Sequence, residues 1–331
     1  MISGRERSED PGQAGPVAAI VGASQGIGRA CAIDLARHGF DVAAVARPKS
    51  TSSGNGLADV IDKVRACGRK ALAVEADISQ RADAESIIGE VLEGLGRIDV
   101  LLMSANWIDH SEGGSYSSRF AEMRRDSIVG HVETTILSHL LILRDITEVF
   151  VRQNKGIVVN ITQNRSSNSR SPQWPMFREP PLMERLQSTD HAFGAVMVPI
   201  VRGATERIAP ALSAEMGEAG CVVVTLDPGL TLSKPGLEAL FAKTKRYQGA
   251  YSTSDAHSVM VPARAVTYIA TCRNPSVFNG MFVDAEDLVR TFGLMTEEEI
   301  HPPLGGTCNR LKQYRQSEVG RTRGRRRTQG R

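Results

Sequence analysis

The sequence predicts a single doubly wound α/β domain, a parallel sheet with helices on both faces. Short apolar runs alternate with longer segments of helical periodicity from residue 17 to residue 283. The runs are continuously apolar, which is typical of parallel strands buried on both faces. No repeat or low-complexity linker divides the chain, and 331 residues with 41% apolar content can bury one large core.

Each element follows from its own segment of this pattern. Strands are expected at residues 17–21, 42–46, 71–74, 100–103, 157–161, 222–226 and 281–283. Helices are expected at residues 29–38, 57–67, 86–95, 120–153 and 200–216. The first two helices are followed by Gly39 and Gly68, and glycine commonly ends a helix because it tolerates a left-handed backbone.

The α/β pattern is expected to occupy residues 16–310, with an insertion at about residues 164–197 before the helix of the sixth strand. Residues 1–15 are predicted to be a flexible N-terminus, and residues 311–331 a flexible basic tail.

The net charge of +3 includes six arginines and no acid in residues 321–331, which leaves −3 on residues 1–320. The tail is interpreted as a solvated end; contact with RNA, an acidic partner or an import receptor is the alternative. The folded body is not expected to bind nucleic acid.

Composition argues against several other classes of protein. No stretch approaches the ~18 consecutive apolar residues of a membrane span, and the polar start of the chain does not resemble a signal peptide. Five scattered cysteines without a C-x-x-C pair favour free thiols over a disulfide framework or zinc site. We therefore expect a cytoplasmic protein without a metal.

A glycine-rich segment lies between the first strand and the first helix. Its candidate nucleotide-binding residues are Gly22, Ser24, Gln25, Gly26, Ile27 and Gly28. Glycines let the backbone approach a diphosphate, and a helix N-terminus supplies unpaired N–H groups. A tight turn is the simpler explanation, but the position between strand and helix favours nucleotide binding.

The spacing G-x-x-x-G-I-G in this segment resembles the short-chain dehydrogenase/reductase family, and further marks extend the resemblance over residues 16–294. These marks are Asp77-Ile78, Asp99–Leu102, Gly156–Ile161, Asp227-Pro228-Gly229 and Asn279–Asp284. The resemblance implies a Rossmann-like fold, an oxidoreductase acting on a small molecule and a nicotinamide cofactor. It also implies cofactor contacts, which we carry over to Asp77, Ile78, Ala105, Arg202, Pro228, Gly229 and Ser233.

Cofactor choice is predicted from the end of the second strand. Members that prefer NAD usually have an acid there, which accepts from the ribose 2′-hydroxyl. Here Ala46 is followed by Arg47, whose forked donors suit a 2′-phosphate. We therefore expect NADP(H), the alternative being an ordinary surface arginine.

The family's catalytic residues are largely replaced. The family uses Asn, Ser, Tyr and Lys, the last two as Tyr-x-x-x-Lys on one helix. Alignment from the flanking marks puts Ser127, Gln163, Val198 and Arg202 at these positions, and no Tyr-x-x-x-Lys occurs anywhere in the sequence. The Asn-Asn-Ala-Gly stretch after the fourth strand is also altered, to Met103–Asn106.

The insertion provides the remaining candidates. Trp174 and Phe177 are apolar enough to form a substrate lid, the alternative being a solvated insertion. Asp190 and His191 at its end are candidates for a replacement acid or base, and so is His131 on the long helix. Solvated side chains, or a core or interface histidine, are the alternatives.

Two functions remain open. One is an atypical NADP(H)-dependent oxidoreductase that transfers hydride to an imine, iminium or conjugated carbon, which needs no tyrosine acid. Members lacking the tyrosine occur in secondary metabolism, where some assist cyclisation. The other is an inactive NADP(H)-binding sensor or scaffold.

The resemblance implies a homodimer or homotetramer formed through residues 120–153 and 200–216, and nothing points to a membrane partner.

Overall fold

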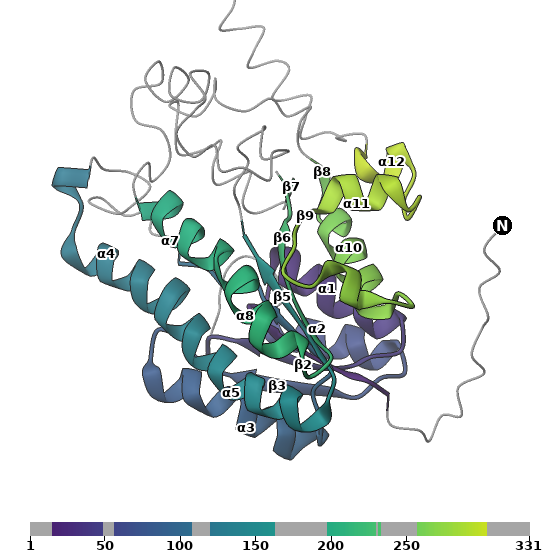
Figure 1. Cartoon of the computed structure of the whole chain (residues 1–331), viewed down its shortest axis with the longest axis horizontal. Coiled ribbons are helices and arrows are strands. Elements are labelled where there is room, and N and C mark those ends of the chain that lie inside the picture. Colours follow the sequence, from purple (N-terminus) through teal and green to yellow (C-terminus); the bar gives the residue numbers. More distant parts are fainter. Residues whose placement is uncertain are drawn as a thin grey trace, which may run out of the picture.

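The computed structural model describes residues 15–48, 56–107, 120–162, 197–229, 231–232 and 257–302. A seven-stranded sheet in the order β3-β2-β1-β4-β5-β6-β9 forms its centre (Figure 1). Every neighbouring pair in it is parallel. Its strands are β1 (Val17–Val21), β2 (Asp41–Ala46), β3 (Ala71–Glu75), β4 (Val100–Met103), β5 (Gly156–Ile161), β6 (Cys221–Asp227) and β9 (Phe282–Asp284). The predicted doubly wound α/β class is confirmed.

Helices cover both faces of this sheet. They are α1 (Gly26–Arg37), α2 (Gly56–Ala66), α3 (Arg81–Leu95), α4 (Arg125–Val132), α5 (Ser138–Gln153), α7 (Met197–Glu206), α8 (Ile208–Gly217), α10 (Met260–Thr271), α11 (Ala285–Thr291) and α12 (Glu297–Ile300). Short 3-10 segments are η1 (Phe120–Glu122) and η5 (Pro275–Phe278), and η2 (Glu133–Leu137) is a π-helix. Two two-residue strands, β7 (Thr231–Leu232) and β8 (His257–Ser258), form a separate parallel pair.

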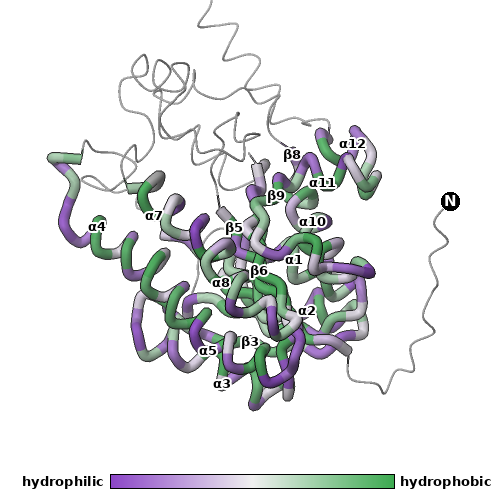
Figure 2. The backbone as a smooth tube through the Cα atoms, viewed as in Figure 1, coloured by the Kyte–Doolittle hydropathy of each residue, from purple (hydrophilic) through white to green (hydrophobic). Residues whose placement is uncertain are grey.

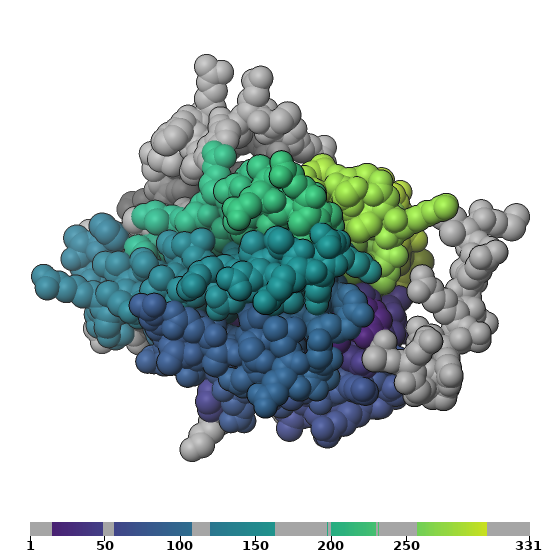
Figure 3. Space-filling model, turned by 60° about the horizontal axis from the view of Figure 1, so that its bottom comes forward, coloured from purple at the N-terminus to yellow at the C-terminus, as the bar shows by residue number. Residues whose placement is uncertain are grey.

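The core forms because successive strand side chains point to opposite faces. In β1, Ala18 and Ile20 pack against α1, α2, α10 and α11, whereas Val17, Ala19 and Val21 pack against α3, α5 and α8. The sheet therefore separates two apolar clusters. Figure 2 shows hydrophobic residues concentrated along the central strands, and Figure 3 shows the helices of the second face side by side, with α5 between α3 and α8.

A buried polar contact joins α1 to α10. Asp34 on α1 is fully buried, and its Oδ2 accepts a hydrogen bond of 2.8 Å from Thr267 Oγ1 on α10. Arg264 Nη1, one turn earlier on α10, lies 3.3 Å from Asp34 Oδ1. The contact compensates the buried carboxylate and fixes the helix that follows the glycine-rich segment.

One predicted long helix is continuous but irregular, and a second is divided. Within residues 120–153, the short segment η1 comes first, and residues 125–153 then form one helix in which the π-turn η2 joins α4 to α5. Residues 200–216 divide at Arg207 between α7 and α8. There Pro210 has no N–H to donate to the Glu206 carbonyl, so a continuous α-helix would lose that bond.

Other boundaries differ by a few residues. The first helix begins at Gly26 rather than residue 29, and α3 begins at Arg81 rather than residue 86. Gly39 and Gly68 adopt the positive φ of a helix end, at 89° and 72°, as predicted. Among the described helices, none is long and apolar enough to cross a bilayer. The predicted insertion and both predicted terminal segments lie largely outside the described residues.

Candidate nucleotide-binding and active site

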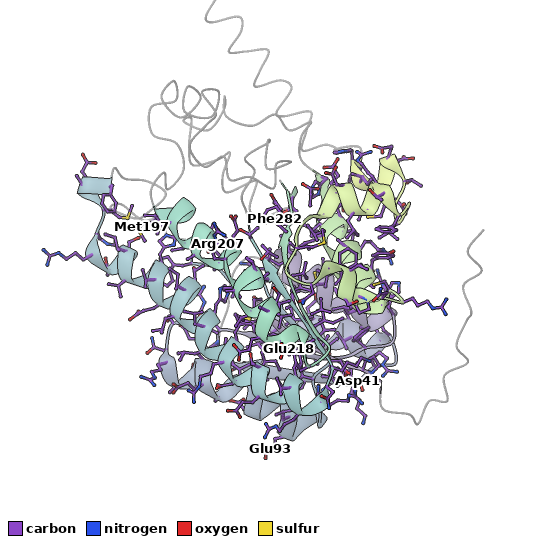
Figure 4. The ribbon with its side chains drawn as sticks, viewed as in Figure 1. Asp41, Glu93, Met197, Arg207, Glu218 and Phe282 are labelled. Carbon is purple, nitrogen blue, oxygen red and sulfur yellow. The ribbon has the colours of Figure 1, made fainter. Side chains whose placement is uncertain are left out.

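The site is located by the topology of the sheet. Strand order reverses between β1 and β4, and ligands of such sheets bind in the crevice outside the carboxyl ends of the strands at this point. Figure 4 marks both ends of the sheet: Asp41 opens β2 at one end, while Met197 and Phe282 lie at the other. The carboxyl ends carry the glycine-rich segment and most of the predicted site residues.

The glycine-rich segment is folded tightly against its neighbours. Gly22 and Ala23 both donate their N–H to the carbonyl of Val45 on β2, at 2.9 and 3.0 Å. Gly22 has φ +93°, and a Cβ there would lie 2.7 Å from the nitrogen of Ala105 after β4. A Cβ on Gly28 would overlap the Gly22 carbonyl oxygen. Both positions therefore require glycine.

The N-terminus of α1 fits the diphosphate of a dinucleotide. Its N-cap, Gln25, makes no capping hydrogen bond with its side chain, and no acidic residue lies in the first turn. A Cβ on Gly26 would meet no described atom within 4 Å, so the space beside this glycine is open. N–H groups at a helix N-terminus beside open space attract an anion. Ser24 and Ile27 are half-buried on either side.

The adenine half of a dinucleotide fits beside β2 and β3. Asp77 Oδ1 accepts hydrogen bonds from Ser79 N and Oγ, at 3.1 and 2.8 Å. This orients the carboxylate and leaves Oδ2 for an amino group. Ile78 is buried next to it. Arg47 is exposed at the end of β2 and forms no ion pair with the other described residues.

The other half of the crevice lies at the ends of β5 and β6. The N–H of Gly229 donates to Asp227 Oδ1 at 2.9 Å, which closes a turn directly after β6. Pro228 and Gly229 are both buried. Ser233, predicted to hold the carboxamide, lies outside the described residues.

Arg202 lies at the end of β5. It is 6% exposed, one helical turn after Val198 on α7, and its Nη1 donates to the Ile161 carbonyl at 3.1 Å. One turn further along α7, Glu206 Oε1 accepts a hydrogen bond of 2.9 Å from Thr162 Oγ1. The bond to Ile161 holds the guanidinium beside the carboxyl end of β5.

The π-helix gathers four polar residues on one buried face. Four fully buried residues recur at intervals of four along this stretch: Ser127, His131, Thr135 and His139. On a straight α-helix, residues twelve apart would be offset by about 120°. A π-turn accommodates roughly one extra residue, and η2 therefore brings Ser127 and His139 almost into line.

This face contacts the end of β4 and α7. Thr135 Oγ1 donates to Asn106 Oδ1 at 3.4 Å, in the altered stretch after β4. A Cβ on Gly130 would lie 2.7 Å from Trp107 Cε2, so the indole packs on this glycine. Burial, followed by the positive charge of Arg202, lowers the pKa of His139 to about 4. The imidazole is therefore neutral at pH 7.

Thr135 and His139 were not predicted as site residues. The repeat of polar residues at intervals of four was the available signal, but it forms one face only if the helix contains a π-turn. Of the predicted catalytic residues, Ser127 and Arg202 are buried near the crevice. Gln163, Asp190, His191, Trp174 and Phe177 lie outside the described residues and stay predictions. The described residues contain no group of three or more potential metal ligands.

Comparisons with known proteins agree with this geometry. The family model for short chain dehydrogenases matches residues 16–177. The short-chain dehydrogenase/reductase eriH of Hericium erinaceus is 45% identical over 89 residues, which is 27% of this chain and 35% of that protein. A short-chain dehydrogenase/reductase of Armillaria gallica is 42% identical over 91 residues, 28% of this chain and 34% of that protein. The chain thus spans about a third of the length of these curated relatives.

Solved structures show the same fold at low identity. A Burkholderia cenocepacia short chain dehydrogenase, solved in complex with NADP, has a TM-score of 0.61 and 18% identity. It aligns over 81% of this chain and 95% of its own. The family model, the glycine-rich segment and the strand order together identify residues 16–177 as a match to the short-chain dehydrogenase/reductase family.

Proposed function

We propose that this protein is an NADP(H)-dependent oxidoreductase that transfers hydride to a carbon needing no tyrosine acid, such as an imine, iminium or conjugated carbon. One observation carries the proposal: the glycine-rich segment proposed to bind the nucleotide is present, while Val198 and a buried Arg202 stand where the family has Tyr-x-x-x-Lys. The bound cofactor would supply the hydride.

The proposed substrate class follows from the protonation states of the described polar residues. Hydride addition to a ketone builds an alkoxide and benefits from a positioned acid. Addition to an iminium carbon neutralises an existing charge and requires mainly orientation. An arginine such as Arg202 keeps its proton in proteins. The lowered pKa of His139 leaves that imidazole neutral. Neither is a good proton donor at pH 7, which favours a substrate that needs none.

The test is NADPH oxidation in the presence of a panel of ketones, enones and cyclic imines. Turnover of imines or enones, with little of ketones, would support the proposal. Faster turnover of simple ketones would contradict it. A role in secondary metabolism, including assistance to cyclisation, is part of the same proposal.

A second candidate is favoured by the missing catalytic motif. A protein that binds NADP(H) without turnover, as a sensor or scaffold, would also retain the glycine-rich segment and lose the tyrosine. Tight NADPH binding with no oxidation against the whole panel would favour this candidate.

We also propose that the protein forms a homo-oligomer through α4 and α5. These helices and the π-helix η2 between them expose Val129, Val132, Leu137 and Leu140, which are 41 to 50% accessible to solvent. Exposed apolar residues grouped in this way commonly mark a protein interface. Figure 3 shows this helix pair along one face of the molecule.

Arg47→Ala is expected to weaken NADPH binding by about 1.5–3 kcal/mol and to leave NADH binding almost unchanged. Arg47 is exposed at the end of β2 and free to pair with a 2′-phosphate, which NADH lacks. Titration with both nucleotides measures the difference. Arg37→Ala, at the far end of α1, is a control for the loss of a surface arginine. Equal losses for NADPH and NADH would show that Arg47 does not recognise the phosphate.

Val198→Tyr combined with Arg202→Lys is expected to leave the native reaction unchanged or slower. The substitutions restore the family's motif, but lysine cannot reproduce the Arg202 bond to Ile161 while also reaching the site. Steady-state kinetics with the native substrate and a simple ketone measures the effect. A rise in native turnover of tenfold or more, about 1.4 kcal/mol of barrier, would show that a missing acid limits the enzyme.

A further inference from the structure

We propose that His257 is a positioning residue for the nicotinamide half of the bound dinucleotide. Its imidazole packs against the Pro228–Gly229 turn and connects this turn to the carboxylate of Glu286 on α11. This inference rests on the proposed function, because it assigns a role toward the cofactor proposed above.

The contact with the turn is close. His257 is fully buried, and a Cβ added to Gly229 would lie 2.5 Å from His257 Nε2. Gly229 also has φ +65°, a conformation that residues with a side chain rarely adopt. The imidazole therefore packs directly against the turn at Gly229.

The backbone of His257 is tied to the same segment. β8 pairs in parallel with β7, and His257 is opposite Thr231, two residues after Gly229. His257 Nδ1 is 3.1 Å from the Ser258 carbonyl oxygen. A carbonyl oxygen can only accept a hydrogen bond, so Nδ1 carries a proton in this contact. The other ring nitrogen, Nε2, faces Gly229 and α11.

The third contact joins the ring to an ionised carboxylate. Glu286 Oε2 lies 4.0 Å from His257 Nε2, and Glu286 also pairs with Arg290 at 3.0 Å and His301 at 3.5 Å. Burial would raise the pKa of Glu286, but the hydrogen bond from Arg290 and the charges of His257, Arg290 and His301 outweigh it and lower the pKa. The turn, the imidazole and the first turn of α11 thus form one continuous set of contacts.

The position of the Pro228–Gly229 turn in the sheet indicates that it lies beside the nicotinamide half of the dinucleotide. Dinucleotides lie across the crevice, with one mononucleotide on each half of the sheet. Asp77 and Arg47 lie on the half formed by β1, β2 and β3, whereas the turn follows β6 on the other half. A shift of the turn would therefore disturb the nicotinamide and leave the adenosine, 2′-phosphate and diphosphate in place.

The experiment compares two probes on the full chain. NADPH carries the nicotinamide, and 2′-phospho-ADP-ribose is the matched compound without it. His257→Leu is expected to raise the dissociation constant for NADPH about tenfold or more, because positioning tolerances are roughly 0.5 Å, and to leave 2′-phospho-ADP-ribose unchanged. His257→Gln, which retains a polar group of similar reach, is expected to restore much of the NADPH affinity.

Glu286→Gln provides a variant away from the turn in case the leucine variant fails to fold. It is expected to weaken NADPH binding selectively, but less than His257→Leu. Equal weakening of both probes, or no weakening of NADPH by either variant, would overturn the role of His257. A wild-type protein that binds neither probe would instead overturn the proposed function.

Discussion

Gly28→Val is expected to raise the dissociation constant for NADPH at least about 100-fold, which corresponds to ~2.7 kcal/mol. Its Cβ would overlap the carbonyl oxygen of Gly22, a backbone atom that cannot rotate away. Gly22 in turn contacts the backbone of Ala105, so the clash would displace the whole glycine-rich segment. The valine side chain would thus weaken binding by distorting the glycine-rich segment, and not by touching the diphosphate directly.

The control for this variant is Gly89→Val. Gly89 lies on the exposed side of α3, and a Cβ there would meet no described atom within 4 Å. Nucleotide titration and circular dichroism on both variants separate local from global effects. A folded Gly28→Val protein that binds NADPH normally would contradict the assignment of the nucleotide site.

Acid is expected to destabilise the protein through His139, by ~3 kcal/mol over the interval in which this residue titrates. Burial, then the charge of Arg202, lowers its pKa from 6.5 to about 4 in the folded state. Between these values the unfolded chain binds a proton that the folded protein excludes. The free energy of unfolding therefore falls as the pH drops from about 6.5 to about 4, and is unaffected by this residue above pH 7.

Urea unfolding at pH 4, 5, 6 and 7 measures this effect, with wild type and His139→Leu compared at each pH. The leucine variant is expected to lose less stability on acidification, by the ~3 kcal/mol assigned to His139. His38→Leu, at the exposed end of α1, is the matched control. Identical pH dependence in wild type and His139→Leu would show that the buried imidazole does not govern acid sensitivity.

The strands could be predicted because a strand that is buried on both faces appears in the sequence as a continuous run of apolar residues. β4 was predicted with its observed bounds, and β1 likewise, since every residue in both is buried. α10 was missed for a related reason. Its twelve residues are largely apolar, and seven are buried, so it lacks the polar stripe that distinguishes a helix in sequence.

Residues of the candidate site could be named from the sequence where the backbone geometry dictates the residue type. Gly22, Gly28 and Gly229 are required by close approach or positive φ, and each was identified. The polar face of Thr135 and His139 was not, because a π-turn changes which residues align without any distinctive residue marking it. His257 escaped notice because its partner Gly229 is close only in space.

The contact between Asp34 and Thr267 has a consequence for biosynthesis. The two residues are 233 positions apart in the sequence. At about 5–20 residues per second, translation would need on the order of ten to fifty seconds to progress from one to the other. During that interval the helix behind the glycine-rich segment lacks its α10 neighbour, and its apolar side stays open to chaperones or to aggregation. Nucleotide affinity should therefore emerge late in synthesis, once α10 has left the ribosome.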